Sequence, residues 1–417
     1  MKTYKAAVIG CSRMGAFIDN EVVGAPGHVP PYAHTAVFYA CPRTHLAACS
    51  DIRPEVMEEV GNQFDIPKER QYTDYKELID REQPDIVSVA TQPEHRAEIV
   101  IYAVEHGAKA IYAEKALSAS MAEADAILEA CERNGAVLNL GTQRRWHPGF
   151  VKMREVIESG RIGDLKTVVF GASSLFNGAS HHYDNLLYLN GDARATWVQM
   201  SLVEGNWEID GDRLTEDPVS HGVIQFENDV TAYAVLSPHE VEWEASCERG
   251  TLTAWAGSKY KIREEGPPGY RGSSTMVAGR FPRHRRYSSN LSLVEDLVNS
   301  LDTGEPPQGG ARAAHAGTEL IFASIESHLR GGARVELPLK GNNTLLKLSA
   351  TRARALRDPG RYSDGDGLHL FIHKNGRKSW VQRITVDGRR RDIGLGGYPT
   401  VSLGAGEEAR NGQSRGD

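Results

Sequence analysis

The first 140 residues alternate short apolar runs with helical patterns, and this alternation constrains the fold more than any other feature. Strands are expected where the apolar runs lie, at 6–9, 46–49, 86–90, 110–113 and 137–140. Helices are expected at 35–40, directly after a capping Asp74, at 94–106 and at 121–134. Strands that alternate with helices form right-handed βαβ units. We therefore predict an α/β domain over residues 1–140, with a parallel sheet covered by helices on both faces.

A different pattern begins near residue 150. After a helix at 150–159, extended stretches follow at 165–171, 219–226, 230–237 and 242–247. Residues 264–289 are rich in Gly, Pro, Arg and Ser, and we expect a long loop there. Two helices (291–301 and 311–329) and a strand at 335–337 complete the region. Residues 141–340 are therefore predicted to form an α+β domain around a mixed, mostly antiparallel sheet.

The net charge of the whole chain conceals two regions of opposite net charge. The whole chain has a formal net charge of −7, which argues against a nucleic-acid binder. Residues 341–417, however, hold 14 basic against 8 acidic side chains, a net of +6, and the rest of the chain carries −13. We interpret the chain as an acidic body with a basic C-terminal module.

The cysteines and the hydropathy of the sequence indicate the cellular compartment in which we expect the protein. The five cysteines are scattered and contain no Cys-x-x-Cys pair, so neither a disulfide framework nor a zinc site is expected. The N-terminal apolar run is too short for a signal peptide, and no run of about 18 apolar residues occurs. We expect a soluble, cytoplasmic protein without a membrane partner.

A glycine motif follows the first expected strand directly: Gly10-Cys11-Ser12-Arg13-Met14-Gly15. It is a Gly-x-Gly-x-x-Gly loop in which Ser12 replaces the middle glycine. In such loops a tight turn leads to a helix N-terminus whose free N–H groups receive a pyrophosphate. A glycine turn in an α/β protein that binds no nucleotide is the alternative.

An acidic residue supports the nucleotide interpretation. Asp51 ends the second expected strand, where its carboxylate would accept the ribose hydroxyls of NAD and repel the 2′-phosphate of NADP. Because Arg53 is nearby, NADP remains an alternative cofactor. The 36 positions between Gly15 and Asp51 exceed the usual spacing of about 20, and residues 20–33 are interpreted as an insertion.

Two further clusters carry groups for proton transfer. Glu114 and Lys115 follow the fourth expected strand, where ligands of parallel sheets bind, and a lysine there can orient a substrate hydroxyl. Residues 177–184 contain His181, His182 and Asp184. Histidine has a pKa suited to proton transfer near neutral pH. One imidazole is expected to be structural, and Asp184 is expected to orient an imidazole or to cap a helix.

Residues 4–340 resemble the Gfo/Idh/MocA family of oxidoreductases. The resemblance rests on several motifs in order: the glycine loop, Asp51, 72–75, Ala90-Thr91 with Glu98, Glu114-Lys115, 143–148, 160–164 and His181-x-x-Asp184. It implies a Rossmann domain followed by an open-faced α+β domain whose sheet forms the interface of a homo-oligomer.

The resemblance also implies a reaction and residue roles. Hydride would pass reversibly between the nicotinamide of NAD and a secondary hydroxyl of a sugar or cyclitol, with no metal required. Lys115 would bind substrate and His181 would be the general acid/base. The implied cofactor site holds the glycine loop, Asp51 and Arg53, together with Thr91, Gln92, Glu114 and Lys115. The implied substrate site holds Lys115, His181, Gln143, Arg145, Trp146, Asn177 and Asp184.

Three departures from the family pattern leave a rival open. Besides Ser12, Ala116 stands in place of the proline of the Glu-Lys-Pro motif, so the Lys115–Ala116 bond is either trans, which would move the lysine, or cis. Asn177 stands in place of an aspartate and lacks the charge that would raise the basicity of His181. A catalytically silent nucleotide-binding member of the same fold is therefore the first rival.

The basic module resembles the arm-type DNA-binding domain of phage-type tyrosine recombinases, over about 345–410. Alternating strands separated by Asn375-Gly376 and Asp387-Gly388 predict a three-stranded meander, and 401–403 would begin a helix. We interpret the module as a fusion. It is either a passenger, which we favour because one small module makes few phosphate contacts, or a DNA-binding part acting through 377–378 and 389–391.

Overall fold

The structure is a computed structural model that describes residues 2–25, 27–205, 207, 209–210, 213–214, 216–236, 243–255, 258–269, 272, 274–339, 357, 360–365, 368–386 and 389–399. The chain forms two compact units. Met1–Val203 and Pro218–Pro338 make up the first, and Glu204–Asp217 and Leu339–Asp417 the second. The predicted boundary at 140 falls inside the first unit, and the three-domain division stays a prediction.

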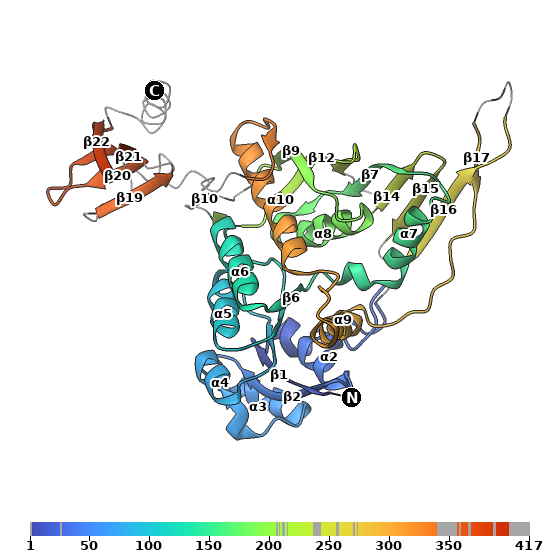
Figure 1. Ribbon diagram of the computed structural model, residues 1–417, viewed down its shortest axis with the longest axis horizontal. Helices are drawn as coiled ribbons and strands as arrows, with labels where there is room; N and C mark the ends of the chain where they lie inside the picture. The colour runs from blue at the N-terminus through green and yellow to red at the C-terminus, as the bar shows by residue number, and fades with distance from the viewer. Residues whose placement is uncertain are drawn as a thin grey trace. The chain divides into compact units, whose positions relative to one another are not determined.

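A six-stranded parallel sheet forms the N-terminal part of the first unit (Figure 1). Its strands are β1 (Tyr4–Ile9), β2 (Thr44–Ser50), β3 (Gln71–Tyr72), β4 (Ile86–Val89), β5 (Ala110–Ala113) and β6 (Val137–Leu140). The order is β3-β2-β1-β4-β5-β6, so the direction of winding reverses between β1 and β4. In open parallel sheets, ligands bind at the carboxyl ends of the strands beside such a reversal.

Helices cover both faces of this sheet, as predicted. One face carries α4 (Tyr75–Glu82), α5 (Pro93–Glu105) and α6 (Met121–Asn134), and the other carries α2 (His34–Ala40), α3 (Pro54–Gln63) and α9 (Ser289–Thr303). Leu78, Val100 and Ile127 pack into the first face. Phe38 and Leu293 pack into the second, so a helix from the far end of the chain completes this core.

Capping residues in the sequence determine where several of these helices begin or end. The side chain of Asp74 accepts a hydrogen bond from the backbone N–H of Lys76 at the start of α4. Ser120 caps α6 in the same way, and Gly135 ends it with a φ of 65°, which glycine adopts without strain. These caps satisfy backbone groups that would otherwise lack partners.

A larger mixed sheet forms the rest of the first unit, in the order β17-β16-β15-β14-β7-β13-β12-β9-β18, with β8 beside β12. Its strands are β7 (Leu165–Gly171), β8 (Ser173–Ser174), β9 (Ala195–Leu202), β12 (Val219–Phe226), β13 (Thr231–Val235), β14 (Trp243–Cys247), β15 (Gly250–Trp255), β16 (Lys259–Glu265), β17 (Met276–Ala278) and β18 (Val335–Glu336). Among the described strands, β7 and β13 pair in parallel and the other neighbours are antiparallel. The predicted mixed sheet is confirmed.

Three helices pack on one face of this sheet (Figure 1): α7 (Pro148–Glu158), α8 (Ser180–Leu189) and α10 (Ala311–Leu329). The rings of Phe150, Phe170, His182 and Trp243 meet beneath α7 and α8. Helix α8 was not expected from the sequence, although it carries the two histidines. The remaining short helical elements are 13–17 (π), α1 (Asp19–Val22), 68–70 (3-10), 143–146 (3-10) and 175–179 (π).

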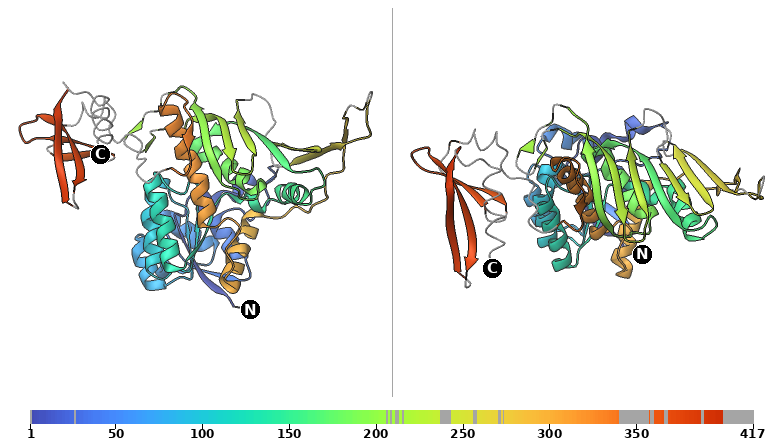
Figure 2. Two further views of the ribbon diagram at one scale, coloured as in Figure 1. Left: turned by 45° about the horizontal axis from the view of Figure 1, so that its top comes forward. Right: turned by 90° about the horizontal axis from the view of Figure 1, so that it is seen from above.

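The expected loop over 264–289 is partly wrong. Residues 276–278 form β17, which pairs with β16 through Arg263 and Ala278, and the resulting hairpin extends beyond the other strands (Figure 2). The strand has three residues, too few for a recognisable alternation of apolar and polar side chains. It forms because the backbone of β16 offers an unpaired edge.

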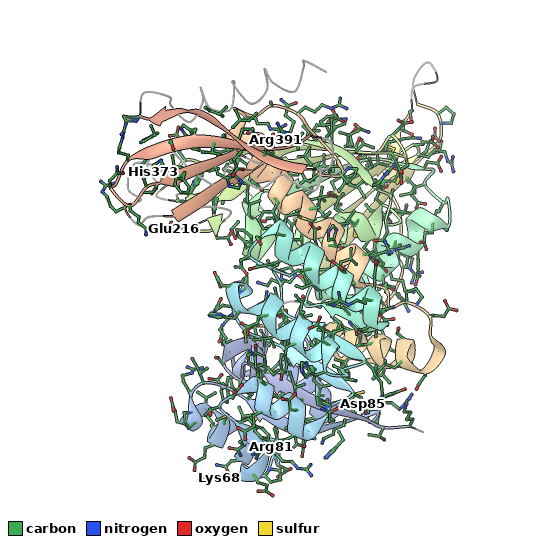
Figure 3. The ribbon with its side chains drawn as sticks, turned by 60° about the vertical axis from the view of Figure 1, so that its left-hand side comes forward. Lys68, Arg81, Asp85, Glu216, His373 and Arg391 are labelled. Carbon is green, nitrogen blue, oxygen red and sulfur yellow. The ribbon has the colours of Figure 1, made fainter. Side chains whose placement is uncertain are left out.

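The second unit contains a four-stranded antiparallel sheet and a short hairpin. The sheet is β19 (Gly360–Gly365), β20 (Leu368–Ile372), β21 (Lys378–Val386) and β22 (Arg389–Tyr398), and the hairpin is β10 (Ile209–Asp210) with β11 (Arg213–Leu214). The prediction of three strands was one too few, because β19 pairs with β20. Leu370 and Trp380 are buried in this sheet, His373 follows β20, and Arg391 lies on β22 (Figure 3). The helix expected from 401 lies outside the described residues.

Candidate active site at the carboxyl edge of the parallel sheet

The glycine loop leaves β1 at the reversal between β1 and β4. Gly10 has a φ of +86°, and a Cβ built there would lie 2.9 Å from the carbonyl carbon of Ala90. A Cβ on Gly15 would lie 1.9 Å from the carbonyl oxygen of Gly10. Both positions therefore require glycine. A π-helical turn, 13–17, and the short α1 follow, where the sequence led us to expect an ordinary helix.

Asp51 lies beside this loop, as its place at the end of β2 predicts. Its side chain is buried, and its carboxylate accepts hydrogen bonds from the backbone N–H of Cys11 at 2.9 Å and of Arg53 at 3.1 Å. The Arg53 guanidinium also donates to the Oγ of Ser12 at 2.6 Å. Hydrogen bonds within the protein therefore hold the Asp51 carboxylate beside the glycine loop.

The other side chains of the loop are engaged locally. Arg13 forms a two-pronged ion pair with Glu21, and Met14 packs on a small cluster around Ile18. Cys11 is fully buried, and the adjacent Cys49 thiol together with burial raises its pKa well above the ordinary value. A buried thiol of raised pKa is unreactive, so the interpretation of Cys11 as a small core residue fits.

Thr91 and Gln92 follow β4 across the reversal from Gly10. The carbonyl of Thr91 accepts a hydrogen bond from Arg96, whose side chain is 2% exposed. The Oγ1 of Thr91 is buried and has no hydrogen-bond partner among the described residues. Gln92 is exposed and precedes the first residue of α5. A buried hydroxyl without a partner is costly, and a bound ligand would supply one.

Glu114 follows β5 and is buried in a network that the sequence did not suggest. Its carboxylate pairs with Nε2 of His34 at 3.3 Å and accepts the backbone N–H of Lys115 at 3.1 Å. Nδ1 of His34 contacts Ser88 Oγ at 2.6 Å, and its ring stacks on Tyr112 at 4.0 Å. Burial acts to raise the pKa of Glu114, but the hydrogen bond and charge of His34, with Lys115 and Arg96, hold it below the usual value.

Lys115 reaches from this strand end to the turn that precedes α8. The Lys115–Ala116 bond is cis, and Nζ of Lys115 donates a hydrogen bond to Oδ1 of Asn177. Asn177 lies in the π-helical turn directly before α8, and His181 lies in the first turn of α8. The structure therefore brings Lys115, Asn177 and the helix of His181 together, as the sequence analysis expected.

The two adjacent histidines have different surroundings. Nδ1 of His181 is buried and has no hydrogen-bond partner among the described residues. Burial, with the charges of Lys115 and Arg144, lowers the pKa of His181 well below its ordinary value. His182 packs among aromatic rings, and burial lowers its pKa to about 3. His182 is the structural member of the pair, as one of the two was expected to be.

Asp184 neither orients an imidazole nor caps a helix, contrary to expectation. It lies within α8 and accepts a hydrogen bond from Nε of Arg145 at 2.7 Å, while Nη1 of Arg145 pairs with Asp192. The side chain of Arg145 is 0% exposed. Both side chains are therefore buried, and the helix places the carboxylate on a face away from solvent.

Of the residues expected near the substrate in 143–146, Gln143 contacts the insertion at 20–33. Its Nε2 donates to the hydroxyl of Tyr32 at 2.5 Å, and burial raises the pKa of that tyrosine to about 12. Trp146 is buried in the core beneath α9. Arg144 was missed: its charge acts on His181, His182 and His147. The double arginine in the sequence contains no signal for which of the two faces the site.

The described residues fit a dinucleotide at this edge. Two glycines keep the loop free of side chains, a carboxylate ends β2, and an unpartnered hydroxyl lies on Thr91. All of them lie at the carboxyl ends of strands beside the reversal, where such folds bind dinucleotides. Within the described ranges, no three His, Cys, Asp or Glu side chains gather as metal ligands, and no helix is long and apolar enough to cross a membrane.

Comparisons with known proteins agree with this arrangement. Residues 18–142 match the oxidoreductase family with an NAD-binding Rossmann fold, Gfo/Idh/MocA, and residues 346–414 match an arm DNA-binding domain. The myo-inositol 2-dehydrogenase of Thermotoga maritima is 32% identical over 284 residues, 63% of this chain and 82% of that protein. The D-apiose dehydrogenase of Paraburkholderia graminis is 30% identical over 164 residues, 39% of this chain and 38% of that protein.

A solved structure of levoglucosan dehydrogenase in complex with NADH and L-sorbose has the same fold, with a TM-score of 0.64 and 18% identity. The alignment covers 81% of this chain and all of that one. Together with the match to the Thermotoga protein over most of its length, these findings establish that the chain belongs to the Gfo/Idh/MocA family of NAD-binding oxidoreductases.

Proposed function

We propose that this oxidoreductase reversibly oxidises a secondary hydroxyl of a sugar, sugar derivative or cyclitol. The observation that carries the proposal is the meeting of Lys115, Asn177 and the first turn of α8, with His181, at the carboxyl edge of β5. The relatives named above are dehydrogenases of myo-inositol and of D-apiose, which supports polyols as the substrate class.

The chemistry needs a hydride acceptor and a proton acceptor. NAD, when bound at this edge, would supply the first as the acceptor of the hydride. In our proposal the proton of that hydroxyl passes to His181, whose neutral imidazole has an unpartnered Nδ1. Lys115 would donate a hydrogen bond to the hydroxyl oxygen and so orient it. Asn177 would hold the ammonium group of Lys115 in place through its amide oxygen.

We propose that Gly10, Ser12 and Gly15 hold the pyrophosphate and that Asp51 accepts the ribose hydroxyls. The carboxylate of Asp51 would repel the extra phosphate of NADP, which supports NAD as the preferred cofactor. The N–H groups of Gly10 and Cys11 are already bonded to Ser50 and Asp51, so N–H groups of the loop from Ser12 onward would carry the phosphate contacts. Calorimetric titration with NAD and NADP tests this preference, and tighter binding of NADP would overturn it.

A catalytically silent nucleotide binder is the rival within the same family, and one experiment separates the two. The purified protein is supplied with NAD and a panel of polyols, aldoses and cyclitols, and NADH absorbance is followed. We expect NADH with at least one of them, and a loss of about 10²–10⁴-fold in kcat/KM for Lys115→Met. Tight NAD binding without NADH from any compound would favour the silent binder.

We further propose a homo-oligomer that forms through the mixed sheet. The outward-facing residues of β13 and of the segment after it include Tyr233, Val235 and Leu236, which are 40%, 37% and 57% exposed. Exposed neighbouring apolar side chains mark interaction surfaces. Light scattering on the wild type and on Tyr233→Glu tests this, and a monomeric wild type would contradict it.

The match of residues 346–414 to an arm DNA-binding domain favours a second candidate function, DNA binding by the basic module. Arg377, directly before β21, and Arg391, on β22, are exposed and could contact phosphates. Gel-shift titration of the full chain against a double Arg377→Gln/Arg391→Gln variant tests this. Salt-sensitive binding that the variant lacks would support it, and no binding at micromolar protein would identify the module as a passenger.

A further inference from the structure

His34 is a buried imidazole to which the proposed transfer of hydride and proton gives no role. It is the first residue of α2 and directly follows the insertion at 20–33. Its side chain has no exposed surface, and both of its ring nitrogens have polar partners. The sequence has no motif at this position, so only the partners of the ring show what it does.

The end of the insertion fixes the place of His34. The carboxylate of Asp19 accepts the backbone N–H groups of Tyr32 at 2.9 Å and of Ala33 at 2.6 Å. The His34 ring itself stacks on Tyr112, with 4.0 Å between the ring centroids and 1° between the ring planes. Backbone and ring are therefore both anchored, and the protein sets the direction in which the imidazole points.

The ring of His34 connects the ends of two neighbouring strands of the parallel sheet. Its Nδ1 lies 2.6 Å from Oγ of Ser88 on β4, and its Nε2 lies 3.3 Å from the carboxylate of Glu114, which follows β5. An ionised carboxylate only accepts hydrogen bonds, so Nε2 carries a hydrogen and donates it. Among the described residues, His34 is the one side chain that donates a hydrogen bond to Glu114.

The same carboxylate holds the backbone beside Lys115. One oxygen of Glu114 accepts the N–H of Lys115 at 3.1 Å. The other oxygen, which pairs with His34, lies so near Gly141 that a Cβ there would be 2.7 Å from it. The carboxylate is thus confined between an imidazole and a backbone segment while it holds the N–H. The direction of the chain at Lys115 in turn determines whether its ammonium group reaches Asn177.

We propose that His34 is a positioning residue: it fixes the carboxylate of Glu114, which fixes the backbone of Lys115 and so directs the ammonium group toward the substrate hydroxyl. The consequence for catalysis rests on the proposed function. Without the Nε2 donor, a buried carboxylate would lack its partner, which is costly, so Glu114 would turn away or take up a proton. In either case the N–H of Lys115 would lose its ionised acceptor.

Acylation of Lys115 tests this position without any turnover. The wild type, His34→Asn and His34→Gln are treated with an amine-acylating reagent, and modified peptides are quantified by mass spectrometry. Both variants lose the ring that stacks on Tyr112, but only the longer Gln side chain can still donate to Glu114 from the place of Nε2.

We expect Lys115 to be acylated at least about fivefold faster in His34→Asn than in the wild type, and within about twofold of the wild type in His34→Gln. Lys109, which is exposed just before β5, is the internal reference and should react equally in all three proteins. Equal acylation of Lys115 in the two variants would overturn the inference.

A double-mutant cycle shows whether His34 acts through Glu114. Glu114→Gln removes the charge at nearly constant volume and should by itself accelerate the acylation of Lys115 at least about threefold. Adding His34→Asn to it should change the rate by less than about twofold, because no carboxylate remains to be fixed. An unchanged rate in Glu114→Gln, or a further acceleration as large as in the wild-type background, would contradict the inference. Glu114→Gln also decides the matter if His34→Asn does not fold.

Turnover then measures the effect on catalysis. With a polyol that the wild type oxidises, His34→Asn should lower kcat about tenfold or more and His34→Gln by less than about threefold. An unchanged kcat in His34→Asn would overturn the inference and leave the proposed function standing. The absence of NADH from every compound would overturn the proposed function, and the acylation rates would still decide whether His34 positions Lys115.

Discussion

Adjacent residues in this protein have different roles, and the two arginines after Gln143 are the clearest example. Arg145 is fully enclosed and paired with Asp184 and Asp192. Arg144 is half-buried, lies over the ring of Phe150 and acts through its charge on the histidines. One side chain therefore pairs with acidic residues in the interior, and the other acts through its charge on the histidines of the proposed site.

Substitution of each of the two arginines should change the stability of the protein by a different amount. We expect Arg145→Met to lower the free energy of unfolding by about 3–5 kcal/mol, because it leaves the buried carboxylate of Asp184 without its partner. Arg144→Met should cost about 1 kcal/mol or less. Urea denaturation of both variants against the wild type measures the difference, and equal losses would contradict the roles assigned here.

The pH dependence of the reaction should report on His181. Its pKa lies well below 6.5, because burial and the nearby charges of Lys115 and Arg144 disfavour the protonated form. Oxidation needs the neutral imidazole, which is present at every pH above that lowered pKa. We therefore expect kcat/KM for oxidation to stay level down to pH 6.5 and to fall only below it. An acid limb above pH 6.5 would contradict this, provided that the same limb is absent from NAD binding.

At the scale of elements, the glycine loop and the strand ends around it form the proposed cofactor site. The loop is closed on itself, because Gly15 approaches the carbonyl of Gly10 too closely for any side chain. Asp51 fixes the start of the loop from β2, and Thr91 faces it from the end of β4. Three separate strands therefore determine one site.

A methyl group in the loop should disturb this arrangement. We expect Gly15→Ala to raise the Kd for NAD at least about tenfold, since its Cβ would collide with Gly10. Gly394→Ala is the matched control, because a Cβ there meets nothing within 4 Å. Calorimetric titration measures both, and equal affinities would show that the loop does not hold the cofactor.

Sequence periodicity was sufficient for five strands of the parallel sheet and for one side of the proposed site. Helix α6 and strands β5 and β6 lie where their apolar pattern and caps placed them, and Lys115 followed from its position at the end of β5. His34 could not be found in this way, because its partner Glu114 is 80 residues away. Strand β19 was missed since its pairing depends on β20, and β17 since it is too short to show a period.

At the scale of the molecule, the chain combines a unit with the family fold, Met1–Val203 with Pro218–Pro338, and a second unit that contains the basic module. The first unit has its own cores on both faces of the parallel sheet, and α9 returns from residues 289–303 to complete one of them. The module has a separate small core around Leu370 and Trp380. Compact units with their own cores fold independently as a rule.

Removing the module should therefore leave the enzyme intact. A chain ending at residue 340 is expected to bind NAD with a Kd within about twofold of the full chain and to melt within about 2 °C of its main transition. Calorimetric titration and thermal denaturation measure these two quantities. An aggregated product or a lost NAD site would show that the module is part of the oxidoreductase.

The central claim is that His181 takes the proton while NAD takes the hydride from a secondary hydroxyl. Single-turnover NADH formation by the wild type and by His181→Ala, each saturated with NAD and a polyol that the wild type oxidises, tests it most directly. The account predicts a rate about 10²–10⁴-fold lower in the variant, with the Kd for NAD unchanged. A variant that forms NADH at the wild-type rate would contradict it.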